Sequence, residues 1–205
     1  MAPYALAADE SCRKVKIGSM DITAHESLTW KYILNQLISG QDLGSRHVDW
    51  AMDEIMTGST PEPILASFLT SLHMKGETSE ELGALARGML AKAETIDLDV
   101  HAVDIVGTGG DQQNTVNIST MAALVIAGTG ATVVKHGNRA STSKSGSADV
   151  LEALGIQLDM PIKSVAACAR QVGITFLFAM TFHPSMRFVG PTRKILGIPT
   201  AFNYL

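Results

Sequence analysis

The hydrophobic residues of this chain change their spacing once, near Asp99, and that change limits the folds open to it. From Ser27 to about Ala93, apolar residues recur at the i, i+3, i+4, i+7 spacing of helices that bury one face. After Asp99, short apolar runs alternate with glycine-rich loops and short helical stretches. The order strand, helix, strand, helix favours parallel pairing with right-handed crossovers. The sequence therefore predicts a small helical domain followed by an α/β domain with a mainly parallel sheet.

The helical part carries its own start and stop signals. Thr60 and Pro61 predict an N-cap followed by proline at the first helical position, and Gly76 ends that helix. Thr78 and Glu81 have the spacing of a capping box. Four short amphipathic helices are expected around 30–38, 48–56, 64–72 and 82–90. Their methionine and aromatic stripes are interpreted as core, because such stripes pack a helical bundle more often than they bind a cofactor.

The second part predicts three strands and three helices. The expected strands are Val103–Val106, Ala131–Val134 and Ile174–Phe178. The expected helices are Ser119–Ala127, Ser145–Leu154 and Pro184–Leu196. Pro191 should kink the last helix or delay its start, because proline lacks an N–H and clashes within a helix.

The bulk properties exclude several classes of protein. The chain has 205 residues, 46% of them hydrophobic, which suits one large domain or two small ones. A net charge of −4 gives no basic field for a nucleic acid. Cys12 and Cys168 are expected to be reduced thiols. The run Met121–Ala127 is too short to cross a bilayer, so we expect a soluble, cytoplasmic protein without a membrane partner.

Three segments carry residues suited to phosphate. Gly107–Asp111 follows a predicted strand, and its glycines let backbone N–H groups approach a ligand; a plain turn that needs glycine explains it equally well. Asn117–Thr120 opens a predicted helix, whose N-terminus attracts anions, although simple capping by Ser119 would also explain it. Residues 135–147 hold three cations, five hydroxyl side chains and two glycines.

The third segment is the most informative, because it follows a predicted strand. Ligands bind at the carboxyl ends of the strands in open α/β sheets. A solvated charged loop is the competing interpretation, and His136 alone could be a structural histidine. Asp104 and Asp111 could simply accept backbone hydrogen bonds. If the three segments meet at one edge of the sheet, they predict a site for a ligand with several phosphates.

These segments resemble the anthranilate phosphoribosyltransferase family in order and spacing. The resemblance rests on Gly107–Asp111, Asn114-Thr115, Asn117–Thr120, and Lys135–Arg139 followed by Ser143–Asp149. It extends from about Leu28 to Leu205. The resemblance implies a small helical domain beside a larger α/β domain, and a homodimer joined through the helices. It also implies transfer of phosphoribose from phosphoribosyl pyrophosphate to the amine of anthranilate, in tryptophan biosynthesis, with Mg²⁺.

The resemblance also implies which residues form the site. Ser119 matches a magnesium ligand, and the positions matching anthranilate contacts are Gly107, Asn138 and Arg193. No residue is assigned as an acid or a base. The positions that match contacts to phosphoribosyl pyrophosphate are Gly107, Gly110, Asp111, Thr115, Asn117, Ile118, Ser119, Thr120, Lys135, His136, Gly137, Asn138, Arg139, Ala140, Ser141, Thr142, Ser143 and Ser147.

The residues themselves agree with those roles. Lys135 and the helix end at Ser119 can hold pyrophosphate as it departs. The amine of anthranilate is already a neutral nucleophile, so orientation can supply most of the rate effect. Arg193 can grip a carboxylate through two hydrogen bonds, although a surface arginine on the last helix is the plainer interpretation.

Two features depart from the family pattern. Gln112 stands where glycine usually follows Gly-Gly-Asp, and it would strain the loop if that position needs a positive φ. The chain ends at Leu205, whereas family members continue with later strands and an acidic pair for magnesium. We therefore expect an incomplete α/β domain, with Val103–Val106 exposed as an edge. A partial sequence and a non-catalytic product that only binds a ligand or partner both remain open, as does a related enzyme with another acceptor.

The expected organisation has four parts. Residues 1–26 form a poorly ordered leader, and 27–98 form the helical domain. Residues 99–182 form the phosphoribosyl pyrophosphate-binding α/β domain. Residues 183–205 contain a return helix that packs with the helical domain.

Overall fold

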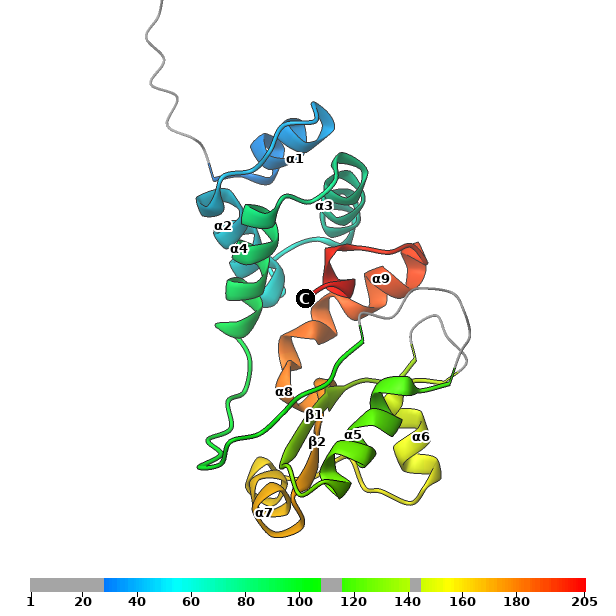
Figure 1. The fold of residues 1–205 in the computed structure, drawn as a ribbon. Helices are drawn as coiled ribbons and strands as arrows, with labels where there is room; N and C mark the ends of the chain where they lie inside the picture. Colours follow the sequence, from blue (N-terminus) through cyan, green and yellow to red (C-terminus); the bar gives the residue numbers. More distant parts are fainter. Residues whose placement is uncertain (1–27, 108–115, 141–144) are drawn as a thin grey trace, which may run out of the picture.

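The computed structural model describes residues 28–107, 116–140 and 145–205. It has a helical part and an α/β part, which Figure 1 shows one above the other. The predicted fold class, a helical domain beside an α/β domain with a parallel sheet, is confirmed. The limits predicted for the domains stay predictions, and the proposed leader at 1–26 lies outside the described residues.

The first four helices are those that the apolar spacing predicts. Thr78 and Glu81 form the predicted capping box, and Gly76 ends the preceding helix at a φ of 87°. The prediction that Thr60 is the N-cap residue is wrong. Pro61 occupies that position, and the side chain of proline has no atom that accepts a hydrogen bond. The four helices are α1 (Trp30–Ile38), α2 (Ser45–Met56), α3 (Glu62–Lys75) and α4 (Ser79–Leu90).

The helices surround one apolar core that includes the end of the chain. Phe68 and Ile33 are fully buried in it, as the predicted stripes require. Val189, Ala201 and Phe202 belong to the same buried cluster. The last residues described therefore stabilise the helical part, and they bring the segment after the sheet back onto it.

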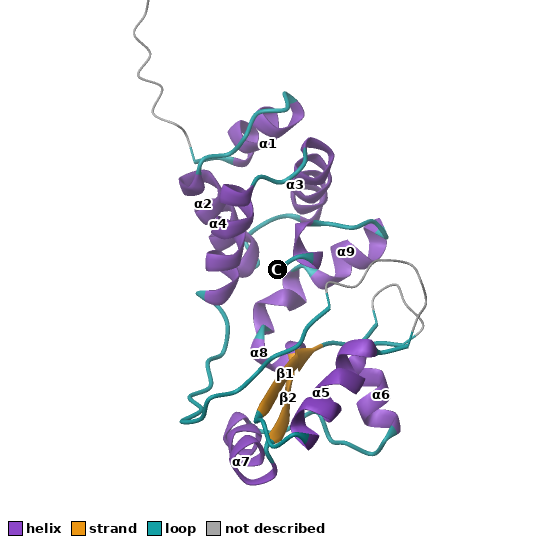
Figure 2. Cartoon of the chain, in the orientation of Figure 1, coloured by secondary structure: helices purple, strands orange, loops and turns teal. Residues whose placement is uncertain are grey.

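The α/β part contains a two-stranded parallel sheet with helices packed against it. Val133 pairs with Ile174, and Gly137 pairs with Phe178, so both strands end at the same edge. Figure 2 shows α5 and α6 on one side of the strands and α7 near their lower end. The elements are β1 (Val133–Gly137), β2 (Ile174–Phe178), α5 (Ile118–Gly128), α6 (Ser147–Ala153) and α7 (Ile162–Val172).

The prediction of a strand at Val103–Val106 is wrong. Of these four residues only Val103 forms a ladder contact with β1, as an isolated parallel bridge to Val133. One residue further on, the side chain of Asp104 accepts the hydrogen bond from the N–H of His136, at 3.0 Å. A carboxylate thus takes the place of a backbone acceptor, and the ladder stops. Val106 is 61% exposed.

The other boundaries shift for local reasons. β1 starts two residues later than predicted and extends through Lys135 and His136, which were expected in the following loop. β2 matches the prediction at both ends. The helix expected at Pro184–Leu196 is divided into a 3-10 turn and a helix, because Pro191 can occupy only a first turn. The two pieces are η1 (Pro184–Phe188) and α9 (Gly190–Leu196), and a further 3-10 turn, η2 (Ala201–Asn203), follows them.

Two helices were missing from the prediction. The helix α7 has no side-chain cap at its start, where Pro161 is the N-cap residue, although Gly173 ends it in the left-handed conformation. The short helix α8 (Ala179–Phe182) follows β2 directly. Within the described residues no helix is both long enough and apolar enough to span a bilayer.

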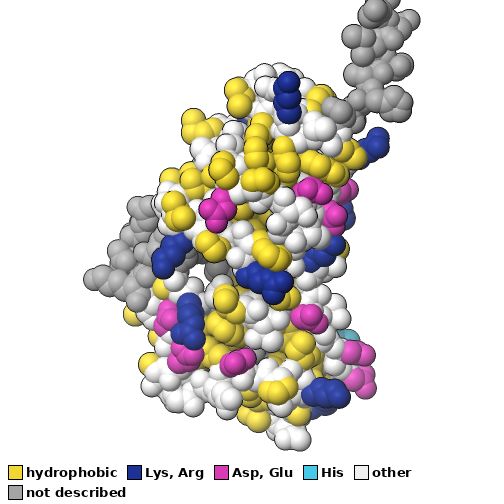
Figure 3. Space-filling view, turned by 180° about the vertical axis from the view of Figure 1, so that it is seen from behind, with side chains coloured by type: hydrophobic (Ala, Val, Ile, Leu, Met, Phe, Trp, Pro, Cys, Tyr) yellow, Lys and Arg dark blue, Asp and Glu magenta, His cyan; other side chains and the backbone are white. Residues whose placement is uncertain are grey.

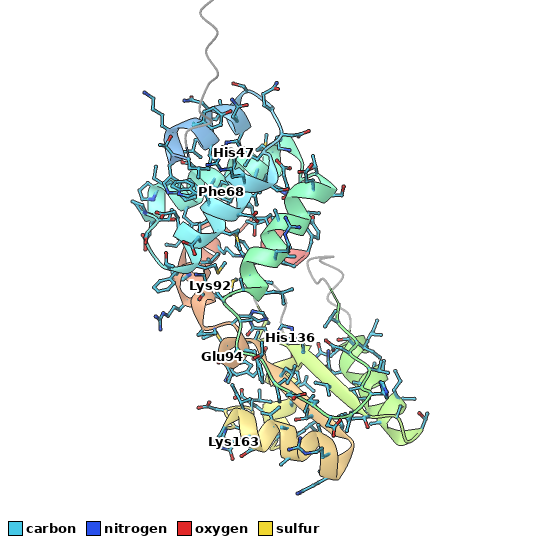
Figure 4. The ribbon with its side chains drawn as sticks, turned by 90° about the vertical axis from the view of Figure 1, so that its left-hand side faces the viewer. His47, Phe68, Lys92, Glu94, His136 and Lys163 are labelled. Carbon is cyan, nitrogen blue, oxygen red and sulfur yellow. The ribbon has the colours of Figure 1, made fainter. Side chains whose placement is uncertain are left out.

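The two parts are joined by backbone contacts as well as by the chain. The N–H of Glu94 donates to the carbonyl of Phe182 at 2.8 Å, which links the segment leaving α4 to α8. Figure 4 shows Glu94 and His136 at the junction, with His47 and Phe68 inside the helical part. His136, one of the predicted site residues, therefore lies where the two parts meet. On the face shown in Figure 3, acidic and basic side chains are interspersed.

A buried ion pair holds the turn between α3 and α4. Glu81 is fully buried and accepts hydrogen bonds from the N–H groups of Leu43 and Thr78 and from Lys75 Nζ, each at 2.8 Å. Burial alone would raise the pKa of Glu81, but these three donors outweigh burial and hold the pKa below its usual value. The carboxylate therefore stabilises the fold at neutral pH and loses that effect as the pH falls through its lowered pKa.

We expect Glu81→Ala to lower the free energy of unfolding by about 3 kcal/mol, because it removes the buried acceptor of the N–H groups of Leu43 and Thr78. It also leaves Lys75, whose side chain is 4% exposed, with only the exposed Asp42 as a partner. Urea denaturation at pH 7 measures the change. Glu80→Gln is the matched control, since Glu80 is an exposed neighbour that accepts one hydrogen bond from Ser45. Equal stability of the two variants would contradict this role.

Candidate functional site

Two of the three predicted phosphate segments, 117–120 and 135–147, meet beside the carboxyl end of β1, and the third is described only at Gly107. Asn138, Arg139 and Ala140 follow the strand directly. The carbonyl of Asn138 accepts from the N–H of Ala148 at 3.2 Å and from the hydroxyl of Ser147 at 3.4 Å. The end of β1 and the first turn of α6 are therefore in backbone contact, which folds residues 135–147 back on themselves.

Gly146 makes this contact possible. A Cβ atom at Gly146 would lie 2.4 Å from the nitrogen of Ala140 and 2.7 Å from the carbonyl oxygen of Asn138. Both are backbone atoms, so neither could move aside without moving the chain. Gly137 is less restrictive, because a Cβ atom there would meet side chains only, at 2.3 Å from the Oγ of Ser147 and 2.9 Å from the ring of Phe176. Neither glycine has a positive φ, so close approach at Gly146 is the reason for glycine there.

The start of α5 joins the same group of segments. Asn117 is its N-cap residue, and its side-chain amide donates to the carbonyl of Gly146 at 3.3 Å. The alternative that Ser119 serves only as the N-cap residue is therefore wrong. Ser119 lies in the first turn of α5 and is half-buried. The N–H groups of that turn carry the positive end of the helix dipole. Ile118, also predicted to contact the donor, is 62% exposed.

Lys135 is a buried cation beneath this edge. Its side chain donates to the carbonyl of Ile105 at 2.7 Å and to that of His136 at 3.3 Å. Burial lowers the pKa of Lys135, and the negative charge of Asp104 only partly opposes this. No carboxylate lies within ion-pair distance of Nζ among the residues that the structure describes. An anion close to Lys135 would therefore stabilise a desolvated charge that Asp104 compensates only in part.

His136 and His183 lie together where the sheet faces the helical part. Their rings are 5.3 Å apart between centroids, edge to face. Burial lowers the pKa of both imidazoles, and for His183 the neighbouring His136 lowers it further. Both rings are therefore neutral at pH 7. The sequence offered His136 as either a ligand contact or a structural histidine, and this packing is compatible with both.

Arg139 is held by acidic side chains of α6. Its guanidinium forms a two-pronged ion pair with Glu152, and Nη1 lies 3.7 Å from a carboxylate oxygen of Asp149. The hydrogen bonds to Glu152 raise the pKa of Arg139. Its charge is thus already neutralised, unlike that of Lys135. Sequence reasoning missed Glu152 and Asp149, although Gly146 and Asp149 have the spacing of a capping motif.

Arg193 lies in α9, on the helical side. Its guanidinium donates to the side-chain oxygen of Asn203 at 3.0 Å and lies over the ring of Phe202. Burial lowers the pKa of Arg193. In the described part of the chain no carboxylate pairs with Arg193, so its guanidinium is available to bind an anionic group. Among the described residues, no hydrogen bond joins Arg193 to Asn138, which was also predicted to contact anthranilate.

The first glycine-rich segment is described only at Gly107. This residue is exposed and ends the segment that Lys135 contacts through the carbonyl of Ile105. The positions outside the described residues are Gly110, Asp111, Gln112, Thr115, Ser141, Thr142 and Ser143. Within the described residues, no three His, Cys, Asp or Glu side chains are grouped to hold a metal ion.

Comparison with known proteins assigns this two-part fold to a family. Residues 99–205 match the glycosyl transferase family, a/b domain, and residues 31–93 match the helical bundle domain of that family. The chain therefore belongs to the glycosyl transferase family.

The relatives it resembles carry a more specific name. A protein named anthranilate phosphoribosyltransferase from Arthrobacter sp. (strain FB24) is 58% identical over 177 residues, which is 86% of this chain and 50% of that protein. The chain spans about half the length of the curated relatives it matches. The resemblance that the four sequence segments predicted is confirmed.

Solved structures agree with this resemblance. The anthranilate phosphoribosyltransferase of Thermus thermophilus has a TM-score of 0.77 and 42% identity, over 83% of this chain and 52% of that one. That of Saccharomyces cerevisiae, in complex with PRPP and Mg, has a TM-score of 0.78 and 34% identity, over 87% and 54%.

We expect Gly146→Ala to lower the free energy of unfolding by about 1–3 kcal/mol, because the new methyl group meets backbone atoms that cannot rotate away. Urea denaturation measures the change. Gly128→Ala is the matched control, because a Cβ atom added there, at the end of α5, would have no other atom within 4 Å. If both variants unfold like the unaltered protein, the close approach at Gly146 is not required.

Proposed function

We propose that this protein transfers the phosphoribosyl group of 5-phosphoribosyl 1-pyrophosphate to the amine of anthranilate, in tryptophan biosynthesis. One observation carries the proposal. The end of β1, the first turn of α5 and the first turn of α6 meet around Gly146, next to a buried lysine with no carboxylate partner in the described chain. That arrangement suits a ligand with several phosphates, and the relatives supply the choice of ligand.

The donor would bind along this edge. The backbone N–H groups at the start of α5 offer donors and a positive dipole end. Lys135 offers a desolvated positive charge that becomes compensated when an anion binds. The described residues proposed to contact the donor are Gly107, Asn117, Ile118, Ser119, Thr120, Lys135, His136, Gly137, Asn138, Arg139, Ala140 and Ser147.

The chemistry needs little from the protein beyond position and charge. Pyrophosphate gains negative charge as its bond to the ribose breaks, and Lys135 with the α5 N-terminus would stabilise that charge. The amine of anthranilate attacks as a neutral nucleophile. It can lose its proton after the bond has formed, so no side chain is assigned as a base. Holding the two substrates in line would then provide most of the acceleration.

The acceptor would be oriented from the other part. Arg193 is half-buried, unpaired with any described carboxylate, and backed by the ring of Phe202. A guanidinium of this kind suits the carboxylate of anthranilate. Asn138 and Gly107 would complete the acceptor side. The site would then lie between the two parts, where substrates often bind.

Magnesium is part of the proposal. The hydroxyl of Ser119, in the first turn of α5, fits a magnesium ion that takes its remaining oxygens from phosphates and water. Bound there, the ion would neutralise charge on the pyrophosphate. A homodimer joined through the helical part and a cytoplasmic location, both implied by the resemblance, belong to the same proposal.

The loss of anthranilate fluorescence tests the function. We expect the fluorescence to fall only when phosphoribosyl pyrophosphate and Mg²⁺ are both added. Calorimetric titration with phosphoribosyl pyrophosphate separates binding from turnover. Binding without turnover would support a binding role alone, and turnover with a different aromatic amine would reassign the acceptor. If the protein shows neither binding nor turnover, the proposal is refuted.

We expect Arg193→Gln to raise KM for anthranilate about 10- to 100-fold with a smaller effect on kcat, because it removes a charged hydrogen bond to the acceptor. Lys194→Gln is the matched control, since Lys194 is the exposed neighbour on the same helix. Steady-state kinetics at saturating donor give both constants. Equal KM values for the two variants would remove Arg193 from the acceptor site.

A further inference from the structure

The carboxylate of Asp149 joins two segments that the proposed donor site requires. One oxygen, Oδ2, accepts from the N–H of Ala140 at 2.9 Å and from that of Gly146 at 2.7 Å. Ala140 ends the segment after β1, and Gly146 is the N-cap residue of α6. A single atom therefore fixes the spacing between the two backbones.

The other contacts of Asp149 extend this connection. Its second oxygen, Oδ1, lies 3.7 Å from Nη1 of Arg139, so it also faces the cation next to Ala140. The carbonyl of Gly146 accepts from Asn117, which connects the same point to the start of α5. The start of α5, the end of β1 and the start of α6 are thus linked through Gly146 and Asp149.

Asp149 itself is poorly placed to contact an anion. Its carboxylate is negative, and the two backbone N–H groups hold its pKa below the usual value. It is therefore ionised at neutral pH and would repel a phosphate. Its side chain is 32% exposed, so it is not part of the packed core either. A charged, partly exposed residue with two backbone hydrogen bonds is best explained by what it holds in place.

We propose that Asp149 is a positioning residue for the phosphoribosyl pyrophosphate site. It sets the placement of Asn138, Arg139 and Ala140 against α6, and thereby the affinity for the donor. This inference rests on the proposed function for its ligand, but the backbone connection itself can be tested separately.

Two substitutions separate the hydrogen bonds from the charge. Asp149→Ala removes both hydrogen bonds. Asp149→Asn keeps one oxygen that can accept both N–H groups, while it removes the negative charge. Asp159→Ala is the matched control, because Asp159 is an exposed aspartate beyond α6. Thermal unfolding shows whether each variant still folds.

Binding of phosphoribosyl pyrophosphate with Mg²⁺, followed by calorimetry, is the main measurement. We expect Asp149→Ala to raise Kd by about tenfold or more, Asp149→Asn to restore most of the affinity, and Asp159→Ala to leave Kd unchanged. If Asp149→Ala lowers Tm but leaves Kd unchanged, the residue is merely structural and the proposal is overturned.

Amide hydrogen exchange gives an answer that does not depend on the ligand. We expect faster exchange at Ala140 and Gly146 in Asp149→Ala, and near-normal exchange in Asp149→Asn. Unchanged exchange at both amides would refute the positioning role. If the unaltered protein binds no donor while these amides respond as expected, the proposed function fails and the connection made by Asp149 stands.

Discussion

The site depends on one close approach, in which the backbone at Gly146 lies against the backbone of Asn138 and Ala140. A side chain at position 146 would overlap three backbone atoms of the segment that follows β1. With glycine there, α6 can start beside the end of the strand, and Asn117 can reach the carbonyl of Gly146 from α5. The parallel register of β1 and β2 places this contact at the edge where ligands bind in such sheets.

The cations of the site differ in how their charges are balanced. Arg139 is paired with Glu152, whereas Lys135 and Arg193 are desolvated and have no carboxylate partner in the described chain. A buried charge without a partner is costly, so it is usually retained for a reason. Under the proposed function, Lys135 would face the pyrophosphate of the donor and Arg193 would face the carboxylate of the acceptor. Each of these two cations would then meet one of the two proposed anionic substrates.

Much of this could be predicted from the sequence, because the patterns concerned are local. The stripe around Phe68, the capping box at Thr78 and the strand at Ile174–Phe178 each depend on a few neighbouring residues. The strand at Val103–Val106 failed because a side chain, Asp104, replaced a backbone acceptor across the sheet. Local propensity contains no information about such a replacement.

Only part of the site could be predicted, because the sequence shows local patterns and not the partners that the fold brings close. The grouping of Asn117, Asn138 and Ser147 followed from strand ends and helix starts. The roles of Asp149 and Glu152 did not, because each depends on a partner brought close by the turn between β1 and α6. Likewise, the sequence showed Lys135 as a loop cation, and only the fold shows that it is buried in β1.

These segments are proposed to form one site for phosphoribosyl pyrophosphate, and chemical-shift mapping can show whether they respond to it as one. Titration of the ¹⁵N-labelled protein with phosphoribosyl pyrophosphate and Mg²⁺ should shift the amides of Ser119, Thr120, Asn138, Ala140 and Ser147 together, with one saturation curve. Amides in α2, far from this edge, should not move. Shifts confined to one segment, or saturation at different concentrations for different segments, would contradict a single shared site.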